Sequence, residues 1–128
     1  MSKYFETKRI QVRYDQVVAV RDVSIYMNEG ETISLIGANG AGKTSTLRAI
    51  TGLTRIADGE IWYDGKRIDT LSTDAIVRAG ITMVPEGRHV FPVMTVKDNM
   101  LMGAFLRRDK AGIEETMEKV VTLFPRLK

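Results

Sequence analysis

Apolar and polar residues alternate along much of the first thirty positions. The alternation runs through residues 10–14, stops at Asp15, resumes at residues 18–20 and continues one position out of phase over residues 23–27. A period of two is typical of a strand with one buried face, and a polar break between two such runs is typical of a turn. A change of phase inside a strand indicates an extra residue. The pattern therefore predicts a β-hairpin whose second strand carries a bulge at residues 21 and 22.

Turn-forming residues divide the remainder of the chain into short elements. Short apolar runs predict strands at residues 31–36, 60–63 and 81–84. Helical spacing predicts helices at residues 43–51, 75–78, 95–106 and 113–124. Gly52 and Gly80 stand at the expected left-handed caps, and Thr95 with Asp98 forms a start similar to a capping box. Antiparallel strands thus precede a strand–loop–helix–strand unit and two further helices, which predicts a mixed α/β domain.

The composition is that of one modest globular domain, with 128 residues of which 44% are hydrophobic and 27% are charged. The formal net charge is +3 and no basic run exceeds two residues, so nothing indicates a nucleic-acid partner. The lack of cysteine excludes disulfides and thiolate metal sites, and a single histidine excludes a histidine-rich zinc site. No apolar stretch reaches the ~18 residues of a spanning helix, and the N-terminus lacks an apolar signal core. We therefore expect a cytoplasmic chain that reaches a membrane only through partners.

One motif carries specific chemistry. Residues 37–44, Gly-Ala-Asn-Gly-Ala-Gly-Lys-Thr, match the phosphate-loop pattern G-x-x-x-x-G-K-[ST] at every fixed position, between a predicted strand and a predicted helix. Glycines let backbone N–H groups close around a phosphate, and the helix N-terminus adds positive charge at the same place. Lys43 would reach the β- and γ-phosphates, and the Thr44 hydroxyl would be a ligand of Mg²⁺. The loop therefore predicts nucleotide binding.

Several protein classes share this loop, and the surrounding residues discriminate among them. GTPases also need an Asn-Lys-x-Asp base-reading motif and an Asp-x-x-Gly motif, which the sequence lacks. Small-molecule kinases usually begin with the strand before the loop, whereas here a hairpin containing Tyr14 comes first. That order resembles the ATP-binding subunit of ABC transporters, as do the hairpin at residues 59–65 and the stretch at residues 84–96. This last stretch is most similar to the ATPases of high-affinity branched-chain amino acid importers, and the resemblance covers nearly the whole chain.

The resemblance implies a fold as well as a family. The expected class is α/β, a P-loop NTPase of the ABC ATPase type with an N-terminal antiparallel β subdomain, truncated before the signature motif and the Walker B strand. Within this N-terminal part of one ATP-binding domain, residues 1–30 and 58–70 would form the antiparallel β region. Residues 31–56 and 72–95 would form the P-loop core, and residues 96–128 would begin the helical subdomain.

The resemblance also assigns roles to single residues. Lys43 and Glu86 would act in catalysis, and Thr44 and Glu86 would hold Mg²⁺. The nucleotide-binding set would be Tyr14, Gly37, Asn39, Gly40, Ala41, Gly42, Lys43, Thr44 and Ser45, with the Tyr14 ring stacked on adenine. Glu86 stands where the family usually has Gln, and a carboxylate there can bind Mg²⁺ directly or through water. The alternation alone favours Tyr14 as a strand residue that packs on the sheet, and a solvated loop acid stays open as the role of Glu86.

The motifs with which the family hydrolyses ATP would follow this segment. The Leu-Ser-Gly-Gly-Gln signature, the Walker B strand with its Asp-Glu pair and the switch histidine do not occur in the 128 residues. His89 comes too early for the switch histidine, so we interpret it as a surface or permease-contact residue. We therefore expect the chain to bind ATP without appreciable turnover. We also expect its parallel strands to lack neighbours, which favours aggregation or strand exchange.

These observations give a prediction of function and two alternatives. The chain is interpreted as part of the ATP-binding subunit of a bacterial ABC importer that binds Mg-ATP to energise amino acid transport, with branched-chain amino acids as the expected substrates. Its expected partners are permease subunits near residues 86–96 and a second ATPase subunit, identical or different, at the inner face of the cell membrane. A soluble ABC ATPase without a transport role and a nucleotide-binding regulatory module stay open as alternatives.

Overall fold

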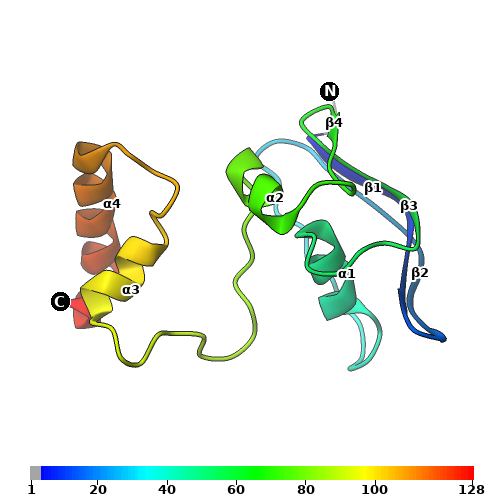
Figure 1. Cartoon of the computed structure of the whole chain (residues 1–128), viewed down its shortest axis with the longest axis horizontal. Helices are drawn as coiled ribbons and strands as arrows, with labels where there is room; N and C mark the ends of the chain where they lie inside the picture. Colours follow the sequence, from blue (N-terminus) through cyan, green and yellow to red (C-terminus); the bar gives the residue numbers. More distant parts are fainter. Residues whose placement is uncertain (1–3) are drawn as a thin grey trace. The chain divides into compact units, whose positions relative to one another are not determined.

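The computed structural model describes residues 4–128, which divide into two compact units (Figure 1). The first unit ends at Met83 and the second begins at Val84. A sheet and the two helices α1 and α2 make up the first unit as described, and α3, α4 and a short 3₁₀ turn make up the second. The predicted mixed α/β character is therefore present in the first unit.

The sheet of the first unit is antiparallel. It consists of β1 (Phe5–Tyr14), β2 (Val17–Met27), β3 (Asp58–Tyr63) and β4 (Lys66–Arg67), arranged in the order β2-β1-β3-β4. The first two strands form the predicted hairpin around Asp15, which adopts a φ of 52°. β1 therefore pairs on one side with β2, the next strand in the sequence, and on the other side with β3, which lies about fifty residues away.

The pairing of β1 with β2 shifts register at three places, after Thr7, after Ile10 and after Val12. Ile10 pairs with Val23 and Val12 with Val20, so β2 has one extra residue between these pairs, which confirms the bulge predicted at residues 21 and 22. A second bulge lies in β1 after Thr7, where Arg9 has a φ of 48°. The sequence did not predict this second bulge, because the apolar alternation that gives the strand phase begins only at Ile10.

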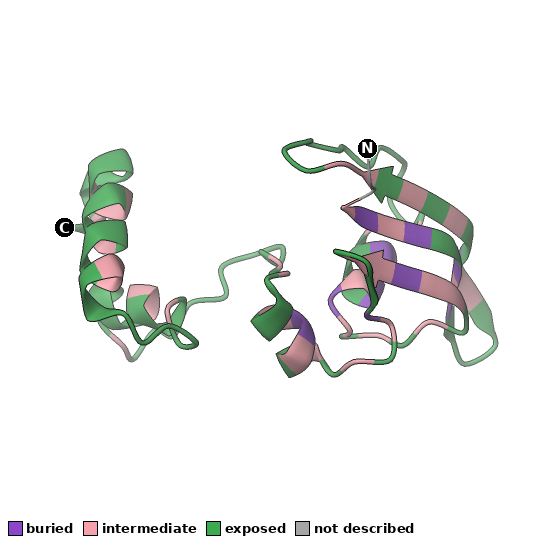
Figure 2. Cartoon of the chain, turned by 90° about the horizontal axis from the view of Figure 1, so that it is seen from above, coloured by how far each residue is buried: buried purple, intermediate pink, exposed green. Residues whose placement is uncertain are grey.

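The core of the first unit lies between the sheet and the helices α1 (Lys43–Ile50) and α2 (Thr73–Ala79). Figure 2 shows the buried positions along the strands and on the inner sides of these two helices. The buried apolar residues are Phe5, Ile10, Val12, Val20, Ala49, Ile61, Ile68 and Ile76. The helix that follows the phosphate loop is thus anchored to the sheet through Ala49, whereas α2 is anchored through Ile76.

Capping residues fix the ends of the helices as predicted. Ser72 accepts a hydrogen bond from the amide of Ala75 at the start of α2, and Gly80 ends this helix with a φ of 112°. After α1, Gly52 has a φ of 73°. In each case the capping residue satisfies or redirects backbone groups that the helix itself leaves without partners.

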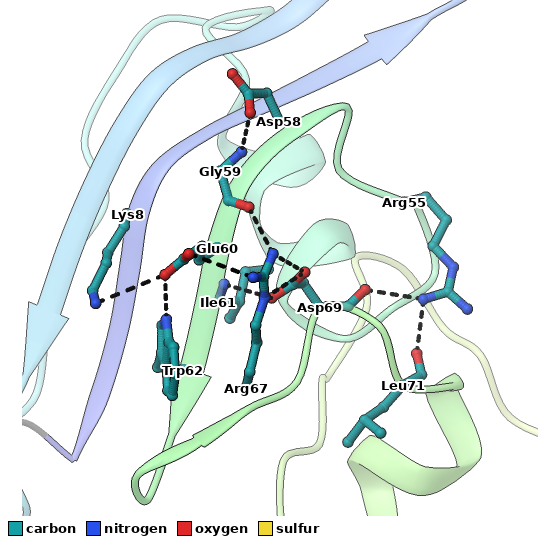
Figure 3. Close-up of polar contacts among 10 residues, drawn as sticks. All are labelled: Lys8, Arg55, Asp58, Gly59, Glu60, Ile61, Trp62, Arg67, Asp69 and Leu71. Carbon is teal, nitrogen blue, oxygen red and sulfur yellow. Dashed lines mark hydrogen bonds and ion pairs between the residues drawn. The ribbon is translucent and has the colours of Figure 1, made fainter.

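A polar network around Asp69 ties the segment after β3 back to the sheet (Figure 3). The Asp69 carboxylate accepts hydrogen bonds from the amide of Ile61 at 3.0 Å and from Arg67 Nε at 2.9 Å, and its side chain is only 6% exposed. Arg55 donates to the carbonyl oxygens of Asp69 and Leu71 at 3.0 and 3.1 Å. Burial raises the pKa of Asp69, but the hydrogen bonds from Arg67 and Ile61 and the charge of Arg67 outweigh burial and hold this pKa below its ordinary value.

The two strands predicted at residues 31–36 and 81–84 are not formed. Both segments lack strand structure, and the side chain of Ile36 is 95% exposed. An apolar run becomes a strand only when another strand accepts its backbone hydrogen bonds, and residues 4–128 contain no strand that pairs with either segment. The prediction of two strands was therefore wrong for this chain, although both segments are apolar as the sequence indicates.

The second unit contains α3 (Val96–Met102), α4 (Lys110–Leu123) and a 3₁₀ turn (Pro125–Leu127). Thr95 caps α3 as predicted by accepting a hydrogen bond from the amide of Asp98. The helix ends at Met102 instead of the predicted Leu106, because Gly103, a residue of low helix propensity, starts a series of turns. In the part of the chain that the structure describes, no helix has the length and apolar character needed to cross a membrane.

Candidate phosphate-binding site

The loop of residues 37–42 leads into α1 through two left-handed glycines. Gly40 has a φ of 83° and Gly42, the residue before the helix, has a φ of 93°. A hydrogen bond from the amide of Ala41 to the carbonyl of Ala38 closes a turn inside the loop. A Cβ at Gly42 would lie 2.6 Å from the carbonyl oxygen of Ala19 in β2, so the loop also approaches the sheet too closely for any side chain there. Conformation and space both require glycine at position 42.

The N-terminus of α1 differs from the starts of α2 and α3. Ser72 and Thr95 cap those two helices with their hydroxyl groups, whereas α1 has no side-chain cap and no acidic residue in its first turn. The first amides of a helix have no acceptor within the helix, and the helix dipole concentrates positive charge there. An anion is the group that satisfies both properties, so this helix start suits a phosphate.

Lys43 adds a full positive charge at the loop. Its ammonium group donates hydrogen bonds to the carbonyl oxygens of Gly37 and Ala38, the second at 2.8 Å. The side chain therefore folds back over the loop and does not extend into solvent. Thr44, the next residue, is exposed and Ser45 is half-buried. The structure thus brings together the lysine, the hydroxyl residues and the loop glycines that the sequence predicted.

The donor set at this loop fits a nucleotide with Mg²⁺. Among residues 4–128 no group of three or more acidic or histidine side chains could hold a metal ion without other ligands. Mg²⁺ in nucleotide sites keeps several waters and takes oxygen ligands from phosphates together with few protein groups. The exposed Thr44 hydroxyl can supply one such ligand, while Lys43 and the helix amides can supply the contacts to the phosphates.

Tyr14 lies beside the helix that carries these residues. It ends β1, its side chain is 42% exposed, and its hydroxyl lies 3.4 Å from Thr54 Oγ1. Hydrogen bonding to the side chains of Ser45 and Thr54 lowers the pKa of Tyr14. The structure therefore places the predicted base-stacking residue near Thr54, which lies forty residues away in the sequence, shortly after α1. No pattern in the sequence predicts the contact with Thr54, because Tyr14 and Thr54 do not belong to a motif that pairs them.

Glu86 and His89 belong to the second unit. The side chains of both are exposed, and His89 Nε2 lies 2.6 Å from the backbone carbonyl oxygen of Glu86, to which it donates. Gly87, between them, has a φ of 93°, which gives this loop a sharp bend. The part of Glu86 in a metal site stays a prediction.

Comparison with known proteins agrees with this geometry. A sequence profile for a family described as "ABC transporter" matches residues 20–126. The high-affinity branched-chain amino acid transport ATP-binding protein BraG of Pseudomonas aeruginosa is 42% identical over 94% of this chain and 51% of its own length. The spermidine/putrescine import ATP-binding protein PotA of Spiroplasma citri is 35% identical over 89% of this chain and 32% of its own length.

A solved structure shows the same fold. It is the dimeric ATP-binding cassette MJ0796 in a post-hydrolysis state with ADP and Pi, which superposes with a TM-score of 0.73 at 22% identity over 82% of this chain and 48% of its own. The chain therefore has the fold of an ATP-binding cassette, as predicted. It spans about half the length of BraG and of this cassette and a third of the length of PotA.

Proposed function

The chain belongs to the ABC transporter family, and from this premise we propose that it is the nucleotide-binding part of an ATP-driven importer. The observation that carries the proposal is the geometry before α1, where left-handed glycines, a helix start without a side-chain cap and the Lys43 ammonium meet. A polyphosphate is the ligand that suits such a group of donors. ATP is favoured because the relatives are named as ATP-binding proteins and the similar cassette holds ADP.

Each residue of the loop has a distinct task in this proposal. In the proposed importer, hydrolysis of the terminal phosphoanhydride of ATP would supply the free energy of the transport cycle. Lys43 would exchange the carbonyl oxygens of Gly37 and Ala38 for phosphate oxygens, which are stronger acceptors because they are charged. Thr44 would hold Mg²⁺ through its hydroxyl, and the amides of residues 39–45 would bind the phosphates. Tyr14 would stack on adenine and keep its hydroxyl toward Thr54.

We further propose that these 128 residues bind Mg-ATP without appreciable hydrolysis. Glu86 would contribute a metal contact, directly or through water, but the sequence contains no Walker B glutamate to orient the attacking water and no signature motif. The relatives, which are about twice as long or longer, have room for these missing parts.

The proposal extends to substrate, partners and place in the cell. Branched-chain amino acids are the favoured substrates because BraG is named for their transport and is 42% identical, whereas PotA, named for polyamines, is 35% identical.

The expected partners are a second ATPase subunit and permease subunits. A second ATPase subunit is favoured by the dimeric cassette. Permease subunits would bind the segment of residues 86–96, which exposes Val90, Phe91 and Val93. These contacts would hold the chain at the inner face of the cell membrane.

The test is a calorimetric titration of Mg-ATP into the chain. We expect saturable binding that weakens by about tenfold or more in Lys43→Ala, since a hydrogen bond to a charged group contributes about 1.5–3 kcal/mol. Lys66→Ala removes an exposed lysine of β4 and is the matched control, with unchanged affinity. Equal binding by Lys43→Ala and the unaltered chain, or no binding by either, would contradict the proposed role of the loop.

A further inference from the structure

Thr54, shortly after the end of α1, contacts the side chain of Tyr14 at the end of β1. Its Oγ1 lies 3.4 Å from the Tyr14 hydroxyl, and Arg48 Nε, in the last turn of α1, donates to the same Oγ1 at 3.5 Å. A guanidinium group donates hydrogen bonds and never accepts them. The threonine oxygen therefore accepts from Arg48, and its own proton is free to be donated to the Tyr14 hydroxyl.

The backbone of Thr54 is held by the end of α1 and by the core, independently of Tyr14. Its amide donates to the carbonyl oxygen of Arg48 at 3.2 Å. Gly52 turns the chain with a left-handed φ of 73°, and a Cβ there would lie 2.9 Å from Cδ1 of the buried Ile76. The turn after α1 therefore packs closely against α2, which gives Thr54 a defined position.

Tyr14 has less support from its own strand. Its side chain is 42% exposed, and β1 ends there because Asp15, with a φ of 52°, begins the turn of the hairpin. An exposed aromatic ring at the end of a strand can adopt more than one staggered rotamer. A ring that a ligand must first orient binds this ligand more weakly, because rotamer entropy is lost on binding.

We infer that Thr54 is a positioning residue, which sets the orientation of the Tyr14 ring before a nucleobase stacks on it. This inference rests on the proposed function, in which Tyr14 stacks on adenine. Because α1 begins at Lys43 and Thr54 follows its last turn, one helix carries the phosphate donors at its start and the support for the tyrosine ring after its end. Thr54 contributes to affinity for the base without touching the nucleotide.

The first test compares calorimetric titrations of Mg-ATP and of Mg-tripolyphosphate, a triphosphate without a base, into the 128-residue chain. Thr54→Val keeps the shape of the side chain and removes its hydroxyl. It should weaken binding of Mg-ATP by about two- to tenfold, the range expected for one hydrogen bond, and leave binding of Mg-tripolyphosphate unchanged. Thr54→Ser keeps the hydroxyl and should keep the affinity for Mg-ATP. Thr70→Val, the matched control at an exposed turn, should change neither affinity.

The second test asks whether Thr54 acts through Tyr14. Tyr14→Phe keeps the ring and removes the hydroxyl, so it should weaken binding of Mg-ATP at least as much as Thr54→Val does. The double variant should bind no more weakly than Tyr14→Phe alone, because both changes break the same contact. Hydrogen bonding to Ser45 and Thr54 lowers the pKa of Tyr14, so Thr54→Val should also raise this pKa, as measured by NMR with isotope-labelled tyrosine.

Three outcomes would overturn the inference. An unchanged affinity of Thr54→Val for Mg-ATP would show that the ring needs no support from Thr54. Equal weakening for Mg-ATP and Mg-tripolyphosphate would show that Thr54 supports the phosphate loop or the fold as a whole. A further loss of affinity in the double variant would show that Thr54 does not act through Tyr14.

Failure of the proposed function would give different results. An unaltered chain that binds neither ligand would contradict phosphate binding by the loop. Equal affinity of Tyr14→Ala and the unaltered chain for Mg-ATP would contradict stacking by Tyr14, and the inference with it. In both cases the pKa of Tyr14 in Thr54→Val would still decide whether the contact between the two hydroxyl groups exists.

Discussion

Gly59 lies where β3 passes the bulge of β1. A Cβ on Gly59 would stand 2.6 Å from the carbonyl oxygens of both Lys8 and Arg9, and the residue has a φ of 95°. These contacts involve backbone atoms, which cannot rotate away as a flexible side chain can. The bulge of β1 therefore requires a glycine at position 59, and the sequence alone does not show this dependence.

We expect Gly59→Ala to destabilise the chain by about 2–4 kcal/mol, because overpacking and a strained φ add. Gly65→Ala is the control, since Gly65 also has a left-handed φ, 72°, but no atom within 4 Å of an added Cβ. Its cost should be only about 1–2 kcal/mol. Thermal unfolding followed by circular dichroism measures both. Equal losses would mean that backbone conformation, and not the contact with β1, requires the glycine.

Asp69 gives a prediction about pH. Its pKa in the folded chain lies below the ordinary 3.8, so it stabilises the fold fully above that value and loses this contribution as the pH falls through the folded pKa. Asp69→Asn should therefore cost about 1–3 kcal/mol near neutral pH, because Arg67 loses the nearer of its two charged acceptors, Asp69 and Glu60. The difference from the unaltered chain should shrink in acid. The measurement is the unfolding free energy across the pH range.

Asp74→Asn is the control for this change. Asp74 pairs with Arg78 on an exposed part of α2, and its side chain is 69% exposed. An exposed pair contributes little to stability, so this variant should shift the unfolding free energy by well under about 1 kcal/mol at any pH. A similar pH dependence for the two variants would contradict the special role of Asp69.

Among the elements, α2 shows how a short helix depends on its ends. It has seven residues, Thr73–Ala79, with a serine cap at one end, Gly80 at the other, and a single buried residue, Ile76, that packs on the core. Nucleation of so short a helix is costly, so capping and one apolar contact decide whether it forms.

Ser72→Ala should lower the unfolding free energy by about 1 kcal/mol, because the amide of Ala75 then loses its side-chain acceptor. Ser34→Ala is the matched control in an exposed segment without secondary structure, and it should have almost no effect. Thermal unfolding of both variants is the measurement. A loss in Ser34→Ala as large as in Ser72→Ala would argue that the effect does not come from the helix cap.

At the scale of the whole molecule, the apolar segment of residues 31–36 is the feature that most affects how the chain associates in solution. It has no strand partner within the described residues, and it exposes Ile36 almost completely. Unpaired apolar segments of this kind favour association between chains.

We therefore expect the chain to self-associate as its concentration rises, and Ile36→Lys to increase the fraction of monomer. Ser34→Lys adds the same charge to the same segment without removing an apolar side chain, so it should have a smaller effect. Light scattering at increasing concentration is the measurement. A monodisperse monomer at high concentration of the unaltered chain would refute the expectation.

Local sequence determined a large part of this protein. The hairpin around Asp15, the bulge at residues 21 and 22, the caps at Ser72 and Thr95, and the phosphate loop before α1 all follow from residues close together in the chain. Alternation, capping chemistry and glycine conformation act over a few positions, which is why they can be predicted without the tertiary structure.

Contacts between distant residues were decided only by the tertiary structure. The bulge of β1 opposite Gly59, the approach of Tyr14 to Thr54 and the missing strand at residues 31–36 depend on which segments meet in space. An apolar run specifies that a segment prefers burial, but a partner strand must be present to accept its hydrogen bonds. The sequence by itself therefore determined the hairpin, the helix caps and the chemistry of the loop. The tertiary structure decided which distant segments pair, and with it whether residues 31–36 form a strand.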